Sequence, residues 1–234
     1  MGKEFEIVRE FTVAASPEQV WDAITDQTAA WLWPLEYEHR LGGDAAFGGK
    51  VTAWDPPHHF ANRVEGPDGW YNNLDNLIEA REGGSWVRYV HSGVFTDDWD
   101  NQYEGADKHT DFYLDALRRY VTHFPGRRAT YAAADGPESS TAPGSFAALV
   151  RALGLPDTVA EGDRVRVSAP GLDDVTVDYR NEYFLGLRTA DAMYRFFGRD
   201  AFGAPVALTV HHFGDIDQKQ TEQSWQSWLD RVYA

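Results

Sequence analysis

Histidine is the residue type in this sequence with the most direct chemical use, and two pairs of neighbours stand out. His58 is followed by His59, and His211 by His212. Histidine is a common metal ligand, but neighbouring residues of a strand point to opposite faces, so neither pair can hold one ion alone. We therefore expect no metal and no cofactor, with the first pair in a solvated loop and the second packed in the ordinary way.

His91 is a candidate for acid–base chemistry. It lies in a predicted strand at 85–95, on one face with Val87 and Tyr89. If that face lines a cavity, the imidazole could exchange a proton with a ligand; alternatively, it is a hydrogen-bonded core histidine. The sequence contains no nucleophile elbow, phosphate-binding glycine loop or zinc-protease motif.

Aromatic residues make up 14% of the chain, and they suit a core, an apolar pocket or an interface. The residues predicted to line a ligand pocket or its mouth are Trp31, Trp33, Trp54, Trp70, Tyr71, Trp86, Tyr89, His91, Tyr113 and Leu117. For Trp54 and Trp86, core packing is the alternative. Arg63 and Asn73, with Asp75, could orient a ligand carboxylate or hydroxyl, or they lie on the solvated face of the sheet.

The first half of the chain contains the elements that must position these residues. Alternation of apolar and polar residues predicts a strand at 5–14. Ser16, followed by Pro17 and Gln19, has the pattern of a capping box at the start of a helix. A short helical piece at 29–33 comes next. The later elements are expected as strands at 50–54, 60–65, 73–80 and 85–95, an acidic loop at 97–105 and a long helix ending near Phe124.

The second half repeats this order in reduced form, beyond a predicted domain boundary at Pro125 and Gly126. Its expected elements are strands at 129–133, 163–168, 176–187 and 204–213, with helices at 146–153 and 218–233. The stretch 189–198 fits either a strand or a helix. The fold class is therefore α+β: a curved antiparallel sheet wrapped on a long C-terminal helix over 1–125, followed by a smaller, degenerate α+β repeat or an unrelated extension over 126–234.

The segment from Phe11 to Asp26, with its run PEQVWDAITD, resembles the opening of the SRPBCC (START-like, helix-grip) superfamily. It is similar in particular to the branch homologous to the activator of the heat-shock chaperone ATPase. Leu114, Leu117, Arg118 and Tyr120 fit the pattern of that family's terminal helix. The resemblance covers roughly residues 3–124 and implies a helix-grip fold, in which any ligand cavity lies between the sheet and the long helix. The second half would then act as support or lid.

The resemblance leaves the function open, because the superfamily includes lipid carriers, polyketide cyclases and chaperone activators. Our leading expectation is a non-catalytic protein that binds a small hydrophobic or aromatic molecule. A protein-interaction role related to chaperone activation is the second, with the acidic first half meeting a basic partner. A cyclase or aromatase is the third, and it would need an acid–base pair such as His91 with a carboxylate.

Composition restricts the partners. The net charge is −16, from 21 basic and 37 acidic residues, so nucleic acid and anionic membrane surfaces are disfavoured. No apolar run approaches the roughly 20 residues needed to insert into a bilayer, and the N-terminal residues do not resemble a secretory signal. Cysteine is absent, which excludes disulfides and favours a cytoplasmic location.

Overall fold

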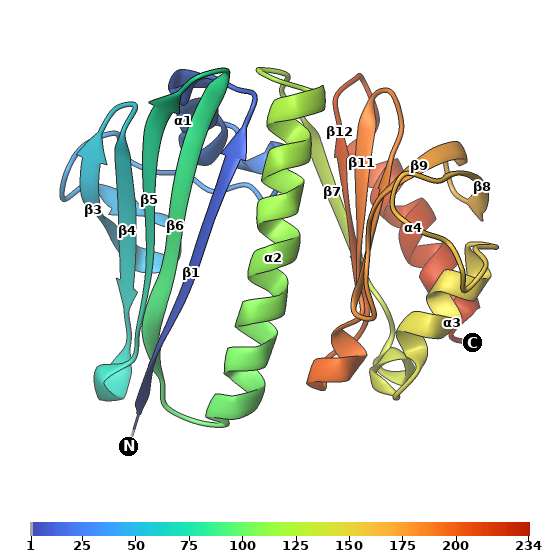
Figure 1. Cartoon of the computed structure of the whole chain (residues 1–234). Coiled ribbons are helices and arrows are strands. Elements are labelled where there is room, and N and C mark those ends of the chain that lie inside the picture. The colour runs from blue at the N-terminus through green and yellow to red at the C-terminus, as the bar shows by residue number, and fades with distance from the viewer. Residues whose placement is uncertain (1) are drawn as a thin grey trace. The chain divides into compact units, whose positions relative to one another are not determined.

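The computed structural model describes residues 2–234, which form two compact units (Figure 1). The first unit runs through residue 127, apart from residues 29–31; these three group with residues 128–234 in the second unit. Each unit contains one six-stranded antiparallel sheet together with helices. The predicted α+β class is confirmed.

The first unit consists of a sheet, a short capped helix and a long closing helix. Its elements are β1 (Lys3–Val13), α1 (Pro17–Thr25), β2 (Asp44–Ala45), β3 (Gly49–Asp55), β4 (His59–Glu65), β5 (Tyr71–Arg81), β6 (Gly84–Phe95) and α2 (Trp99–His123). Short 3-10 turns cover Thr28–Ala30, Ala46–Gly48 and Pro67–Gly69. The strand order is β1-β6-β5-β4-β3-β2, with the first and last strands adjacent.

The start of α1 matches its sequence pattern. The Ser16 hydroxyl accepts a hydrogen bond from the Gln19 backbone N–H at 3.3 Å, and the Gln19 side-chain oxygen accepts one from the Ser16 N–H at 2.9 Å. These reciprocal bonds satisfy backbone donors that a helix N-terminus otherwise leaves unpaired. The predicted capping box is therefore confirmed.

The long helix α2 packs on one face of the first sheet. Phe5, Ile7 and Phe95 form a buried cluster there, against which Trp99 and Tyr103 of the first helical turns pack. The prediction of a loop at 97–105 was wrong, because α2 begins at Trp99. The Trp99 and Tyr103 rings stack at 4.7 Å between centroids, so packing orders a segment whose acidic residues suggested a loop.

The second unit has the same kind of sheet. Its elements are β7 (Thr130–Asp135), α3 (Ser145–Ala152), β8 (Arg164–Ala169), β9 (Leu172–Arg180), β10 (Phe184–Arg188), β11 (Ala192–Phe197), β12 (Ala207–His212) and α4 (Gln218–Val232), with 3-10 turns at Glu138–Thr141 and Arg199–Phe202. The strand order β7-β12-β11-β10-β9-β8 follows the same path as in the first unit. The two halves of the chain thus share the order of strands within the sheet as well as the order of elements along the sequence. The second sheet has as many strands as the first.

Two details of the second sheet differ from the sequence prediction. The single strand expected at 176–187 is two strands, because the Asn181 side-chain oxygen accepts hydrogen bonds from the Tyr183 and Phe184 N–H groups and closes a turn. The ambiguous stretch at 189–198 contains strand β11. All six residues of β11 are buried, which removes the polar–apolar alternation that identifies a strand.

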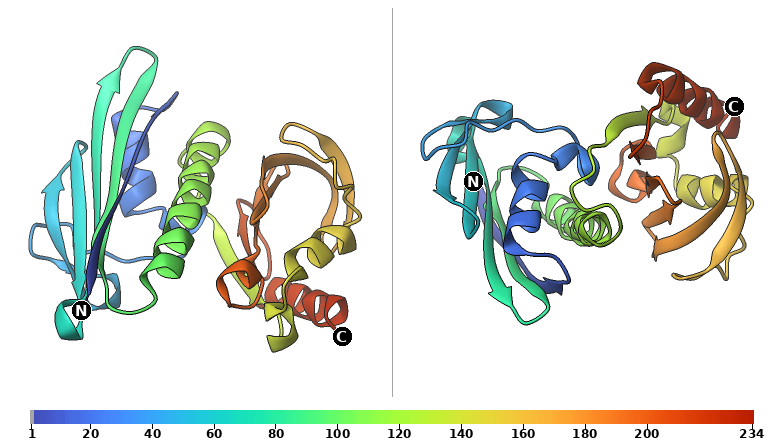
Figure 2. Two further views of the ribbon diagram at one scale, coloured as in Figure 1. Left: turned by 60° about the horizontal axis from the view of Figure 1, so that its bottom comes forward. Right: turned by 90° about the horizontal axis from the view of Figure 1, so that it is seen from above.

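One face of the second sheet is covered by the helices of its own unit, and Figure 2 shows the sheet curving round α3 and α4. Tyr194, Phe196 and Val210 from the sheet pack there with Trp225 and Leu229 of α4.

The opposite face contains a buried ion pair. Arg195 donates to both carboxylate oxygens of Asp178, at 2.9 and 3.2 Å. Gly186 provides the room for this pair, since a Cβ at that position would overlap with the Asp178 carboxylate.

Candidate functional site

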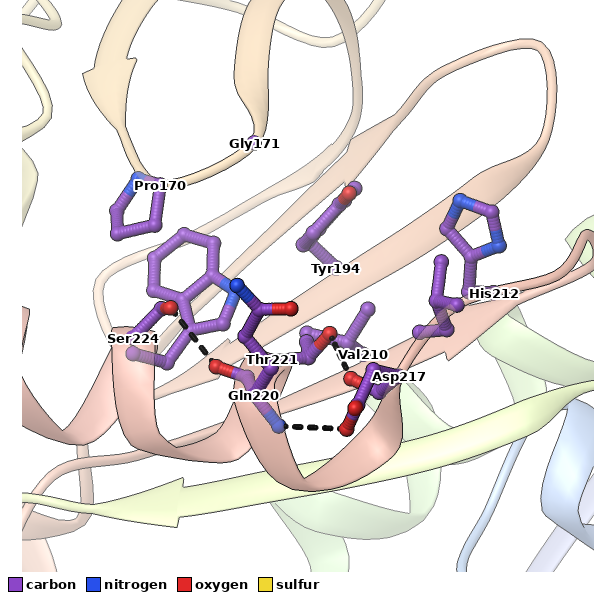
Figure 3. Close-up of a pocket in the computed structure, with 11 residues that line it drawn as sticks. Pro170, Gly171, Tyr194, Val210, His212, Asp217, Gln220, Thr221 and Ser224 are labelled. Carbon is purple, nitrogen blue, oxygen red and sulfur yellow. Dashed lines mark hydrogen bonds between the residues drawn. The ribbon is translucent and has the colours of Figure 1, made fainter.

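A pocket of about 300 Å³ lies between the second sheet and the closing helix α4 (Figure 3). This volume is at the lower end of the range for small-molecule sites, about 300–1,000 Å³. The pocket is lined by Pro170, Gly171, Tyr194, Val210, His212, Ile216, Asp217, Gln220, Thr221, Ser224 and Trp225. It therefore has the position, between a sheet and a terminal helix, that the helix-grip resemblance implies for a ligand.

The sheet supplies one wall of the pocket. Tyr194 of β11 and Val210 of β12 are cross-strand partners, and His212 follows Val210 by two residues on the same face. In Figure 3, Tyr194 lies between His212 at the right and Pro170 and Gly171 of the β8–β9 turn at the upper left. Gly171 has φ +69°, a conformation that favours glycine in this tight turn.

Helix α4 supplies the other wall, with polar side chains at 217, 220, 221 and 224. The Asp217 carboxylate caps the helix by accepting from the Gln220 N–H at 2.9 Å. The Thr221 hydroxyl donates to the Asp217 carbonyl at 2.8 Å, and the Ser224 hydroxyl donates to the Gln220 carbonyl at 2.8 Å. Because both hydroxyl protons are directed at the helix backbone, the free lone pairs of these oxygens can only accept hydrogen bonds.

His212 has a hydrogen-bonding partner or a charge beside each ring nitrogen. Its Nδ1 lies 3.0 Å from the Gly214 N–H and 3.2 Å from the Gly214 carbonyl oxygen. Its Nε2 lies 3.7 Å from a carboxylate oxygen of Asp191. Both ring nitrogens of His212 therefore face groups of the protein itself.

Tyr194 and Trp225 provide the aromatic surface of the pocket. Their rings lie 5.9 Å apart between centroids, and Trp225 also contacts Phe196. Burial, together with the negative charge of Asp191, raises the pKa of Tyr194 to about 12. The phenol is therefore neutral near pH 7 and can donate or accept a hydrogen bond.

The predicted residues of the first unit lie on two faces of its sheet. Tyr89 and His91 are on the face that packs against α2. The Asn72 side-chain amide donates to His91 Nε2 at 2.9 Å, and the Phe5 ring contacts the imidazole edge-on at 5.0 Å. Burial lowers the pKa of His91 to about 4, so the ring is a neutral, hydrogen-bonded histidine at pH 7.

Four further predicted residues belong to this inner side of the first unit. Trp33 contacts Tyr113 of α2 edge-on at 5.4 Å, and the Trp33 indole nitrogen is buried without a hydrogen-bond partner among the described residues. Leu117 is buried in the same helix. Trp54 is partly buried and packs against Trp21 at 4.9 Å between ring centroids.

The remaining sheet residues lie on the opposite face. Arg63 and Asn73 are cross-strand partners, and Asn73 also pairs with Ser92, next to His91 in the strand. Their side chains therefore point away from the face that carries His91, which corresponds to the second of the two positions that the sequence allowed, the solvated face of the sheet. The Arg63 guanidinium instead lies 3.7 Å from the centre of the Tyr71 ring and donates to Glu65.

The other predicted tryptophans are separated from the inner face as well. Trp86 pairs with Thr12 and Glu79, one residue out of phase with buried Val87, and its ring lies beside Arg81. Trp31 groups with the second unit, where it is buried. Trp70 ends the turn at Pro67–Gly69, in the connection between β4 and β5.

Sequence reasoning missed three asparagines on the inner side of the first sheet. Asn72 contacts His91, while Asn62 and Asn76 are buried. Asn72 and Asn76 alternate with Asn73 and Asp75 along β5, so the predicted polar residues were one position out of phase.

The pocket of the second unit was missed too. None of the predicted site residues lines it. A signal was present, since polar residues at 217, 220, 221 and 224 follow helical spacing beside Trp225 and Trp228, on a face that must pack against a sheet.

A second pocket, of about 430 Å³, lies along the segment 34–47 of the first unit, which includes the short strand β2. It is lined by residues 34–38 and 44–47, including Phe47, whose side chain is 75% exposed. The predicted site residues do not line it either. Because one continuous segment of the chain forms this pocket, the sheet–helix pocket of the second unit is the better candidate.

Neither a metal site nor a membrane span is found in the described part of the chain. Residues 2–234 contain no group of three or more His, Cys, Asp or Glu side chains arranged to hold an ion. Within the same residues, no helix combines the length and apolarity needed to cross a membrane.

Comparison with known proteins gives structural similarity alone. No protein-family model matches the chain, and no curated protein matches its sequence. The crystal structure of DynU16, a protein in the dynemicin biosynthetic locus, is 14% identical with a TM-score of 0.43, covering 97% of this chain and 95% of its own. The Aha1 dimer from Colwellia psychrerythraea is 21% identical with a TM-score of 0.42, covering 50% of this chain and 96% of its own.

A third similar structure is protein MLL2253 from Mesorhizobium loti. It is 19% identical with a TM-score of 0.44, and the match covers 51% of this chain and 98% of that protein. Values this low assign neither an activity nor a ligand to the chain.

Proposed function

We propose that this chain is a binding protein that holds a small molecule with an aromatic or apolar body in the pocket between the second sheet and α4. The observation that carries this proposal is the composition of the pocket walls. Trp225, Tyr194 and Val210 form an apolar surface, and the polar side chains of α4 lie opposite. Ligand sites typically combine a mainly apolar lining with a few polar groups that fix orientation.

The same walls favour binding over catalysis. General acid–base chemistry needs a group whose pKa lies near the working pH and which can reach the reacting proton. Tyr194 has a pKa of about 12, and both nitrogens of His212 face groups of the protein itself. The hydroxyls of Thr221 and Ser224 donate their protons to helix carbonyls, whereas an activated nucleophile donates its proton to a base.

A pair of tryptophan substitutions on α4 tests the proposal. Thr221→Trp places a large ring in the pocket, whereas Gln223→Trp adds the same ring on the exposed side of the helix, outside the pocket lining. A library of small aromatic compounds is screened against the full chain by native mass spectrometry, and each binder is then titrated. We expect binders of the wild-type protein to bind Gln223→Trp equally and to lose at least tenfold in affinity for Thr221→Trp.

The proposal is contradicted if Thr221→Trp, shown to be folded by circular dichroism, retains wild-type affinity for every binder. An absence of binders across the library also counts against it.

Three earlier predictions stay predictions. The inner face of the first unit, with Tyr89, His91 and Tyr113, keeps its predicted role as a ligand-binding surface. The protein-interaction role and the cyclase-like role are also untested, and the arrangement of the described pocket favours neither.

A further inference from the structure

The lining of the second-unit pocket carries negative charge. Asp217 contributes a carboxylate, and the lining contains neither lysine nor arginine. Asp191 lies beside His212 at the same end of the sheet wall. The charged group closest to a ligand would therefore be an anion.

The N-terminus of α4 does not make the pocket a binding site for anions. A helix N-terminus usually attracts anions through its unpaired N–H groups and its dipole. Here the Asp217 carboxylate occupies that position and accepts the Gln220 N–H. An anionic ligand would have to displace this cap or approach it against like charge.

The hydrogen-bonding groups of the helix wall point to the same class of ligand. The Thr221 and Ser224 hydroxyls donate to helix carbonyls, so toward the pocket they offer lone pairs. The second Asp217 oxygen is likewise an acceptor. An ammonium group has three donors and no acceptor, which complements these three acceptors, and the Gln220 carboxamide in the same lining can present its oxygen to it. The faces of Trp225 and Tyr194 stabilise a nearby cation further.

We propose, on the basis of the binding function argued above, that the pocket selects a small aromatic molecule bearing a protonated amine. The amine lies toward Asp217, Thr221 and Ser224, and the aromatic body lies against Trp225 and Tyr194. The ligand's charge thus distinguishes it from neutral or anionic molecules of the same shape.

Three indoles of nearly equal size test this selectivity: tryptamine is cationic, tryptophol neutral and indole-3-acetate anionic at pH 7.5. Isothermal titration of the full chain measures each affinity. We expect tryptamine to bind about fivefold more tightly than tryptophol, as a partly exposed ion pair allows, and indole-3-acetate to bind most weakly. Raising the salt concentration should narrow the difference between tryptamine and tryptophol.

Asp217→Asn identifies the residue responsible. Asparagine caps helices about as well as aspartate, so the fold is retained while the charge is removed. Tryptamine should then bind about as weakly as tryptophol, whose affinity is unchanged. Asp230→Asn removes the same charge from α4 outside the pocket, and it should leave all three affinities as in the wild type.

The outcomes separate this inference from the function on which it rests. Equal binding of tryptamine and tryptophol, abolished for both by Thr221→Trp, would overturn the amine preference and support the binding function. A tryptamine preference that survives Asp217→Asn also overturns the inference. Affinities that are unchanged in Thr221→Trp contradict both, because the probes would then bind elsewhere. Failure of all three indoles to bind overturns the amine inference, while the library screen still decides the binding function.

Discussion

At the scale of single residues, the direction of each polar group decides what it can do. The hydroxyls of Thr221 and Ser224 donate their protons within α4, which leaves their two oxygens as acceptors toward the pocket. For His91 and His211, the surroundings of the ring decide its charge. Each is a polar ring that folding places where it stays neutral: His91 accepts from Asn72, and His211 contacts the Ala29 carbonyl at 2.8 Å.

These two histidines predict acid sensitivity. Burial lowers the pKa of His91 to about 4 and that of His211 to about 3, from about 6.5 in the unfolded chain. A lowered histidine pKa favours the folded state fully above pH 6.5, and this contribution is lost as the pH falls through the folded pKa. We expect His91→Gln, compared with the wild type by urea unfolding, to lose about 2 kcal/mol less stability between pH 7.5 and 4.5.

The glutamine variant keeps an acceptor for the Asn72 amide and cannot be protonated in this range. Equal loss of stability in the variant and the wild type between pH 7.5 and 4.5 would show that His91 is not held neutral by folding.

At the scale of elements, the sequence predicted the helices and strands whose residues follow a regular pattern. The capped start of α1, the alternating strands of the first sheet and the amphipathic closing helices were all recognisable. Strand β11 was not, since burial on both faces removes its alternation. The turn at Asn181 was missed because its signal is a single side chain.

The candidate site was harder to predict than the elements, because a site depends on the phase of each strand. A shift of one residue in β5 exchanges Asn72, which contacts His91, for Asn73 on the opposite face. Residues of three separate elements and a turn line the second-unit pocket. No local sequence pattern indicates which faces of these elements pack against one another.

The buried pair of the second sheet gives a prediction at this scale. Replacing Asp178 by Asn, or Arg195 by Met, leaves one buried charge without its main counter-charge, and each change should cost about 3 to 5 kcal/mol. The double variant should recover most of that loss, because neither charge then remains. Chemical denaturation of the four proteins measures the coupling; additive losses in the double variant would contradict a direct stabilising contact between the two side chains.

At the scale of the whole molecule, the chain contains one topology twice. Both sheets place the first strand beside the last and proceed back through the remaining strands. The sequence led us to expect any ligand cavity in the first unit, where the family resemblance is strongest. The described pocket between a sheet and its closing helix instead lies in the second unit, so resemblance to a family and the position of the pocket do not coincide in this chain.

The charge of the whole molecule agrees with the preference inferred for the pocket. A net charge of −16 attracts cationic ligands and repels anionic ones over distances set by the salt concentration. The net charge of the protein raises the rate at which a cationic ligand encounters it, whereas Asp217 stabilises the amine once the ligand is in the pocket.

The most direct test of the central claim is to locate a bound ligand by NMR. The full chain, labelled with ¹⁵N, is titrated with tryptamine and with the best binder of the aromatic library, and the shifts of backbone amides and indole N–H groups are followed. The account predicts saturable changes centred on the Trp225 indole and on amides 217–225, absent in Thr221→Trp and present in Gln223→Trp. Saturable changes centred elsewhere, with the pocket amides unmoved by either compound, would contradict it.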